Sequence, residues 1–233
     1  MARKVQFAFS RGEMAPDLFG RSDTQGYGFG LATASNVQVL QQGGIRNRAG
    51  LRFLAPTKDH NRKVRLIPFV FGGADTHILE FGHEYIRIMR GDGHVTVGNI
   101  NITAVSQTNP VEVTTSGAHG YTTGDEVFLS GVGGMFEVTE NRYVITVTAT
   151  DKFTLQDQVD GTNIDGTGFG AFTSGGEVSK IFEIASPYTE DELFDISFKQ
   201  AFDVVTLVHP NHKRKELIRG GISNWALLDV DPT

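Results

Sequence analysis

The sequence predicts an all-β protein in which a discontinuous antiparallel β platform domain is interrupted by a small β-barrel. The composition is the first observation, because 28 Gly, 17 Phe and many Val, Ile and Thr favour strands and turns over helices. The second is the scarcity of amphipathic runs long enough to form a helix. The third is a change of texture, because basic residues nearly vanish between Thr103 and Ser179 while Thr and Gly become frequent.

The strands expected before this change are short and are separated by turn residues. Residues 66–71 are mostly apolar on both faces, although Pro68 cannot donate to a β-ladder. Residues 85–90 alternate as a half-buried strand does, and Gly91-Asp92-Gly93 is a hairpin turn signal. One short helix is expected around residues 22–32. We predict strands at residues 4–9, 37–41, 52–55, 64–71, 77–81, 84–89 and 95–97.

The middle segment carries about the number of strands that a small barrel needs. Removing it would join Ile102 to Lys180 and leave a continuous β-meander. Insertions are tolerated at exposed hairpin tips, where the two ends of the guest lie close together. We therefore predict a host domain of residues 1–102 and 180–233 and an inserted module of residues 103–179. Its strands are expected at residues 102–106, 111–114, 126–130, 142–149, 152–155 and, after a Gly- and Asp-rich loop, 176–179.

Charge is distributed unevenly along the chain. The net charge is −6, but residues 1–65 carry 11 Lys and Arg against 4 Asp and Glu, whereas residues 103–179 carry 2 against 10. Such segregation predicts different partners for the two regions, and an acidic module is poorly suited to DNA. The absence of Cys excludes disulfides and thiol-ligated metals. With no apolar run of about 20 residues and no signal-peptide core, we expect a soluble chain without a membrane-spanning segment.

Seven basic residues are the best candidates for a functional surface. Lys and Arg contact phosphates without reading sequence, so a DNA conduit could use weak, scattered contacts of this kind. The alternatives are a solvated face and salt bridges to a neighbouring subunit, and the aromatic residues that would stack single-stranded bases are not interleaved here. A second cluster, residues 213–215, is expected to be a solvated loop. The candidate DNA- or subunit-contacting residues are Arg46, Arg48, Arg52, Lys58, Arg62, Lys63 and Arg65.

The sequence shows no signature of catalysis or of cofactor binding. The GxxxxGK[ST] phosphate loop and the serine nucleophile elbow are absent. Adjacent acids such as Asp125 and Glu126 point to opposite faces of a strand, so they do not form the opposed carboxylates of a glycosidase. We predict that the protein is not an enzyme, with no catalytic residue and no cofactor.

Two histidines come nearest to a metal-binding pattern. His209 and His212 are three residues apart and Asp203 precedes them, but Pro210 favours a turn over a helical face. The full ligand set and spacing of a zinc site are missing from the sequence. We therefore predict no metal site.

Three motifs follow one another between Phe9 and Leu54. They read FSRGEMAPDLFGRSD, then YGFGLATASNV, then QGGIRNRAGLRF. In order and spacing they resemble the start of the tail nozzle proteins of short-tailed phages, also called tail tubular protein B. Ala15, Asn47 and Leu51 depart from the usual Ser, Arg and Thr of that family. Residues 187–210, from PYT to HP, are similar to a later segment of the same family.

The inserted module resembles the small β-barrel known as the first catalytic cysteine half-domain of ubiquitin-activating enzymes. The resemblance lies in GYTTGDEV at residues 120–127, in Gly131 to Gly134, in residues 141–144 and in Phe153-Thr154-Leu155. Because the chain contains no Cys, the resemblance implies the barrel fold and none of the chemistry of ubiquitin activation.

The nozzle resemblance implies a structural virion protein located in the phage tail. In that family a homo-oligomeric ring, a hexamer, forms or gates the DNA ejection channel and meets adaptor and fibre proteins, with transient, non-specific contact to genomic DNA. This chain covers only the N-terminal part of the family's length. The alternative is a tail-associated binding module for a host-surface glycan or a tail fibre, and a weaker third possibility is a depolymerase. Exposure of the barrel aromatics would favour the binding module, and their burial a plain core: Phe136, Tyr143, Phe153, Phe169 and Phe172.

Overall fold

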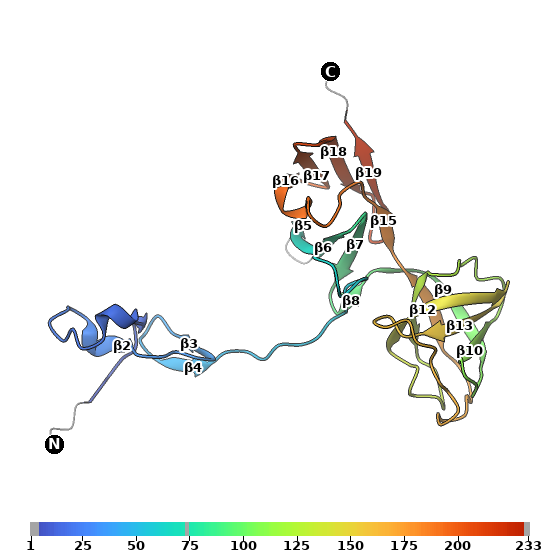
Figure 1. The fold of residues 1–233 in the computed structure, drawn as a ribbon, viewed down its shortest axis with the longest axis horizontal. Helices are drawn as coiled ribbons and strands as arrows, with labels where there is room; N and C mark the ends of the chain where they lie inside the picture. The colour runs from blue at the N-terminus through green and yellow to red at the C-terminus, as the bar shows by residue number, and fades with distance from the viewer. Residues whose placement is uncertain (1–4, 73–74, 231–233) are drawn as a thin grey trace. The chain divides into compact units, whose positions relative to one another are not determined.

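A computed structural model describes residues 5–72 and 75–230 of the chain. It divides the chain into two compact units, Met1–Phe53 and Leu54–Thr233 (Figure 1). Strands account for 44% of the structure and helices for 4%, so the predicted all-β class is confirmed. No helix among these residues is long and apolar enough to span a bilayer.

The first unit is built from very short elements. A parallel pair joins β1 (Gly12–Glu13) to β2 (Gly30–Leu31), and an antiparallel pair joins β3 (Val37–Val39) to β4 (Ile45–Asn47). The 3₁₀ helices η1 (Pro16–Leu18) and η2 (Tyr27–Phe29) lie between the first two strands.

Three expected elements of this unit are wrong. Residues 5–9 and 52–55 form no strand, and residue 4 lies outside the described residues. The helix expected at residues 22–32 is reduced to η2, since Gly26 precedes it with a φ of 90°. That left-handed conformation cannot continue a helix.

The second unit contains a sandwich of two antiparallel sheets. One has the order β15-β7-β6-β5 with β8 beside β7, and the other has the order β16-β17-β18-β19. The strands of the first sheet are β5 (Arg65–Val70), β6 (Thr76–Gly82), β7 (Tyr85–Arg90), β8 (Gly93–His94) and β15 (Glu183–Ala185). After the short helix η3 (Leu193–Asp195), the second sheet is made of β16 (Ser197–Ala201), β17 (Val204–His209), β18 (His212–Arg219) and β19 (Trp225–Asp229).

Both sheets contribute to one hydrophobic core. In β5 the alternation of side chains places Ile67 and Phe69 in this core and leaves Leu66 and Val70 exposed, as the period of two requires. Pro68 is tolerated because β5 is the last strand of its sheet. The second sheet contributes Val205, Leu207, Leu217 and Trp225 to the same core.

The other part of the second unit is a closed six-stranded barrel, which confirms the predicted barrel. Its strand order is β10-β13-β12-β11-β14-β9, and closure leaves no free sheet edge. The strands are β9 (Thr96–Val105), β10 (Glu112–Thr115), β11 (Glu126–Ser130), β12 (Asn141–Ala149), β13 (Lys152–Gln156) and β14 (Glu177–Ile181). Each lies at or close to an expected strand. The barrel encloses its own core, which includes Val113, Leu129, Ile145, Phe153 and Leu155.

The chain enters and leaves the barrel through two paired strands. Ile100 in β9 is the register partner of Val178 in β14, and the N–H of Ile102 donates to the carbonyl of Gly176 at 2.9 Å. The barrel strands thus run from Thr96 to Ile181. We predicted a host domain of residues 1–102 and 180–233 and a separately folded guest of residues 103–179. Whether the guest folds independently of the host stays a prediction.

The barrel aromatics divide unequally between core and surface. Tyr143 and Phe153 are buried, and Phe169 and Phe172 are half-buried against the same core. Phe136 is 72% exposed. The aromatics are therefore mostly barrel core, with one ring left on the surface.

Candidate functional site

The seven predicted basic residues are divided between the two units. Arg46, Arg48 and Arg52 belong to the first unit and are exposed. Arg46 donates from Nε to Oε1 of Gln38 at 2.9 Å, across the β3–β4 pair. Lys58, Arg62, Lys63 and Arg65 belong to the second unit.

The four cations of the second unit are engaged by groups of the same chain. The Lys58 ammonium lies 2.5 Å from Oε1 of Glu183, and Arg62 lies 3.1 Å from Asp59 and 3.8 Å from Glu190. The Lys63 ammonium lies 3.6 Å from the Asp191 carboxylate. Arg65 donates from Nη1 to two carbonyls at 2.7 Å, those of Leu193 and Ile196. These four cations, which we predicted to contact DNA or a neighbouring subunit, thus have partners within their own chain. Contact with DNA or with a subunit stays a prediction.

A cavity of about 290 Å³ lies between the sandwich and the barrel. Arg87, from β7, is its central side chain: it lies 2.7 Å from Oε2 of Glu126 in β11 and 2.9 Å from Oε2 of Glu183 in β15. Burial alone would lower the pKa of Arg87, but the two carboxylates outweigh it and raise the pKa. The charged residues of the wall are three cations and three anions, so the cavity has no charge preference for a ligand: Lys58, Arg87, Lys180, Asp125, Glu126 and Glu183.

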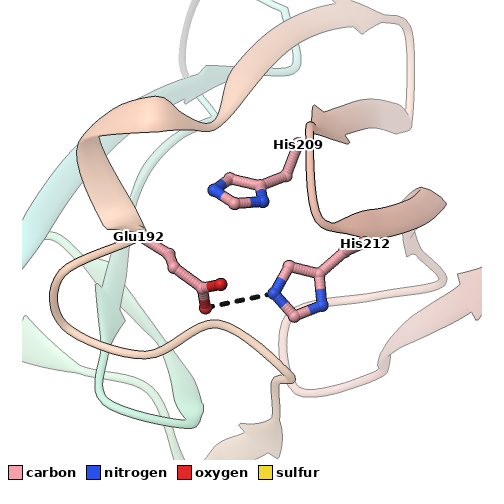
Figure 2. A group of neighbouring side chains, drawn as sticks. All are labelled: Glu192, His209 and His212. Atoms are coloured by element: carbon pink, nitrogen blue, oxygen red, sulfur yellow. Dashed lines mark ion pairs between the residues drawn. The ribbon is translucent and has the colours of Figure 1, made fainter.

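A second cluster joins the turn between β17 and β18 to the segment before η3. His209 ends β17 and His212 begins β18, and the two are register partners across the hairpin. Their ring centroids are 5.0 Å apart. Nε2 of His212 lies 3.0 Å from Oε2 of Glu192, and Figure 2 shows the Glu192 carboxylate and both imidazole rings facing a common space. One ligand atom from each of the three side chains lies within 4.8 Å of the other two.

The carboxylate of this cluster is held in its ionised form. Glu192 Oε2 accepts hydrogen bonds from the N–H of Thr189 at 3.0 Å and from its hydroxyl at 2.9 Å. The bond from the Thr189 N–H, the nearby His212 ring and the Thr189 hydroxyl lower the pKa of Glu192 to about 2. The Glu192 carboxylate is thus negatively charged at neutral pH.

Tyr188 forms the floor of the cluster. It is fully buried, and its ring lies 5.1 Å from that of His212 and 6.0 Å from that of His209. Its hydroxyl has no hydrogen-bond partner among the described residues, and burial raises the pKa of Tyr188 to about 12. The phenol therefore stays neutral.

Comparisons with known proteins give no family for the chain. No protein-family profile matches it, and no curated protein matches it. Among solved structures, a phage phi92 endosialidase is similar over 74% of this chain and 30% of that chain, with 14% sequence identity and a TM-score of 0.22. The chain thus spans about a third of the length of that protein. A TM-score this low supports no conclusion on function.

Sequence reasoning reached two members of the histidine cluster and missed the third. It grouped His209 and His212 with Asp203, but Asp203 lies 3.4 Å from Nη1 of Arg219 instead. Glu192 joins them because the segment after β15 folds back over the hairpin. The only signal in the sequence was the TEDE run at residues 189–192, in which a Thr precedes a Glu by three positions, the spacing of a capping box.

Proposed function

We propose that the chain is a structural protein of a bacteriophage tail, part of a ring-shaped nozzle that forms or gates the DNA ejection channel. Copies of the chain would be its first partners, with tail adaptor and fibre proteins beside them. The ordered motifs between residues 9 and 54 support the family, and the all-β architecture is compatible with it.

The observation that carries the proposal is the absence of a core in the N-terminal unit. Among residues 5–53 only Gly30 and Gly43 are buried, so no apolar side chain of this range is buried. Phe7, Leu51 and Phe53 are instead 87%, 86% and 78% exposed. A unit of this size needs apolar burial, disulfides, metals or association to be stable. Exposed apolar side chains in such number mark an interaction surface, which supports assembly.

Charge supports contacts between copies. Residues 1–53 carry 7 Lys and Arg against 3 Asp and Glu, whereas residues 54–233 carry 14 against 24. Opposite charges favour encounter between the first unit of one copy and the second unit of another. A head-to-tail contact of this kind repeats, and it closes into a ring when the rotation between copies allows.

A non-enzymatic role agrees with the way buried charges are used. The buried carboxylate of Glu80 accepts a hydrogen bond from the Tyr85 hydroxyl at 2.8 Å and lies 3.1 Å from Nε2 of His94. Glu126 forms a buried ion pair with Arg87. Each of these buried carboxylates thus has a partner inside the fold, as structural ion pairs do.

One observation favours the alternative, a module that binds a host-surface glycan or a tail fibre. Phe136 lies in the loop between β11 and β12 and is 72% exposed, and an exposed ring can stack on a sugar face. Replacing Phe136 with Ser should abolish binding to immobilised host glycans or fibre protein if this role is real. If the Phe136→Ser variant binds as the parent does, Phe136 does not support the binding-module alternative.

Assembly is tested by light scattering coupled to size exclusion, with negative-stain images of the peak. The full chain should form a discrete oligomer with a ring outline. The double variant Leu51→Ser, Phe53→Ser should shift the peak toward monomer. Phe202→Ser is the matched control, because Phe202 is equally exposed, at 87%, but belongs to the second unit. A strict monomer at all concentrations would contradict assembly by this chain.

A further inference from the structure

The cluster of Glu192, His209 and His212 is preorganised by the backbone. The two imidazoles are fixed by the hairpin register of β17 and β18, in which they are paired. The carboxylate is fixed by the two hydrogen bonds from Thr189. Three side chains from two separate segments therefore face one space without depending on flexible loops alone.

The donor set fits a transition metal. Two imidazoles and one carboxylate form a recurrent zinc ligand set, with metal–ligand distances near ~2 Å. Ligand atoms in a tetrahedral site of that size are about 3.3 Å apart, and the Nε2 of His212 already lies 3.0 Å from Oε2 of Glu192. That nitrogen is buried and makes no hydrogen bond of acceptable geometry, so the short contact does not satisfy it.

The tautomer of His209 is also suitable. The N–H of Asn211 donates to Nδ1 of His209 at 3.1 Å, so in the neutral ring Nδ1 has the lone pair and Nε2 has the proton. A metal that binds through this lone pair displaces the hydrogen bond from the Asn211 N–H, and that N–H must then bond to water.

The cluster is open to an ion and closed on its inner side. The side chains of Glu192 and His212 are 21% and 22% exposed, so solvent reaches part of each, although Nε2 of His212 itself is buried. The buried ring of Tyr188 packs against both histidines, and Thr189 orients the carboxylate from behind. Outer contacts of this kind fix ligand orientation in metal sites.

We propose that Glu192, His209 and His212 bind one divalent transition-metal ion, with Zn²⁺ the preferred occupant and water at the remaining position. The ion connects the β17–β18 hairpin, through His209 and His212, to the segment before η3, through Glu192. Its role is to stabilise the sandwich, and it is independent of whether the chain assembles in a phage tail.

The full chain, stripped with EDTA and dialysed, provides the test. Calorimetric titration with ZnCl₂ near neutral pH should give one ion per chain, and the melting temperature should rise with free Zn²⁺ because the ion binds the folded state. Co²⁺ should bind at the same site and show the visible absorption of a four-coordinate complex.

Variants locate the ion. Glu192→Gln keeps the shape and the acceptor for Thr189 but removes a charged ligand, and His212→Gln removes an imidazole. Each variant should weaken Zn²⁺ binding at least ~10-fold, because replacing a residue that only contacts a metal ligand already lowers metal affinity by about that factor. His60→Gln is the matched control, since His60 is exposed and outside the cluster, and it should bind as the parent does. Absence of saturable binding, or equal affinity in all three variants, would overturn the proposal.

A measurement on the parent chain covers the case in which a variant fails to fold. Imidazole ¹⁵N chemical shifts of the labelled parent chain should change for one ring nitrogen of His209 and one of His212 when one equivalent of Zn²⁺ is added, because each of these nitrogens then binds the ion. The shifts of His60, which is exposed and outside the cluster, should stay unchanged. Unchanged shifts at His209 and His212 would contradict the site.

Discussion

Arg87 of the sandwich and Glu126 of the barrel form an ion pair of 2.7 Å between two buried side chains. Arg87 lies in the middle of β7, and Glu126 is the first residue of β11. Glu183 contacts the same guanidinium at 2.9 Å from a strand just beyond the barrel. The barrel is therefore held to the sandwich by this ion pair as well as by the two chain segments that lead into β9 and out of β14.

Removing the cation should be costly. In Arg87→Met the apolar stem is kept, but Glu126 is left buried without its partner, and breaking one side of a buried pair typically costs about 3–5 kcal/mol. We expect the free energy of unfolding, measured by urea titration, to fall by that amount. The double variant Arg87→Met, Glu126→Leu should recover much of the loss, because the buried Glu126 carboxylate is then removed together with its partner.

An exposed ion pair gives the control for this prediction. Lys63 and Asp191 lie 3.6 Å apart with side chains 68% and 85% exposed. Lys63→Met should change the free energy of unfolding by less than about 1 kcal/mol. If Arg87→Met were as mild as Lys63→Met, the pair between sandwich and barrel would not be a stabilising joint.

Gly134 should be irreplaceable for a steric reason that Gly131 lacks. Both have positive φ, 83° and 65°, but a Cβ on Gly134 would lie 2.1 Å from the carbonyl oxygen of Ala171, whereas a Cβ on Gly131 meets nothing within 4 Å. Gly131→Ala should cost about 1–2 kcal/mol from backbone strain alone. Gly134→Ala should cost clearly more in the same urea titration. Equal losses would show that the loop at Ala171 moves away freely.

Much of the second unit could be predicted from local patterns. The alternation of residue types in β5 and β7 and the regular spacing of barrel strands depend on neighbouring residues, so a period of two identifies these strands. The half-buried character predicted for residues 85–90 was wrong, because β7 buries Tyr85 and Arg87 on one face as well as Ile86 and Ile88 on the other. The N-terminal unit was harder to predict, because glycines with positive φ, such as Gly26, interrupt runs that otherwise look like a strand or a helix.

Contacts between distant residues could not be predicted in this way. Lys58 was expected on a DNA- or subunit-facing surface, yet it pairs with Glu183, which lies 125 positions later in the chain. Glu192 meets His212 for a similar reason, since the segment after β15 packs against the hairpin. Sequence spacing carries no information on such pairs without the sheet order.

Asp125 should make the barrel sensitive to acid. Burial alone would raise the pKa of Asp125, but hydrogen bonds from the Lys180 ammonium, at 2.7 Å, and the Thr122 N–H, at 2.9 Å, outweigh it and lower the pKa. A lowered folded-state pKa contributes stability above the unfolded value, about 3.9, and this stability is lost as pH falls through the folded value.

Urea titrations from neutral pH down to about pH 3 should show the effect of Asp125 near its unfolded pKa. Asp125→Asn should be less stable than the parent by a constant amount above about pH 5, and the difference should shrink as the parent carboxylate is protonated. In Lys180→Met the loss of stability in acid should begin at a higher pH, because the Lys180 ammonium no longer lowers the pKa of Asp125. Parallel curves for the parent and Asp125→Asn would exclude this contribution.

The two hydrophobic cores allow a test of the predicted guest and host domains. Leu207 in the sandwich core and Leu155 in the barrel core are both fully buried, and Leu→Ala at such sites typically costs about 2–5 kcal/mol. If the barrel folds independently, Leu155→Ala should speed amide hydrogen exchange in β9 to β14 and leave β16 to β19 protected. Leu207→Ala should do the reverse. Loss of protection across both parts in either variant would mean one cooperative unit, in which case residues 103–179 are not a separate guest.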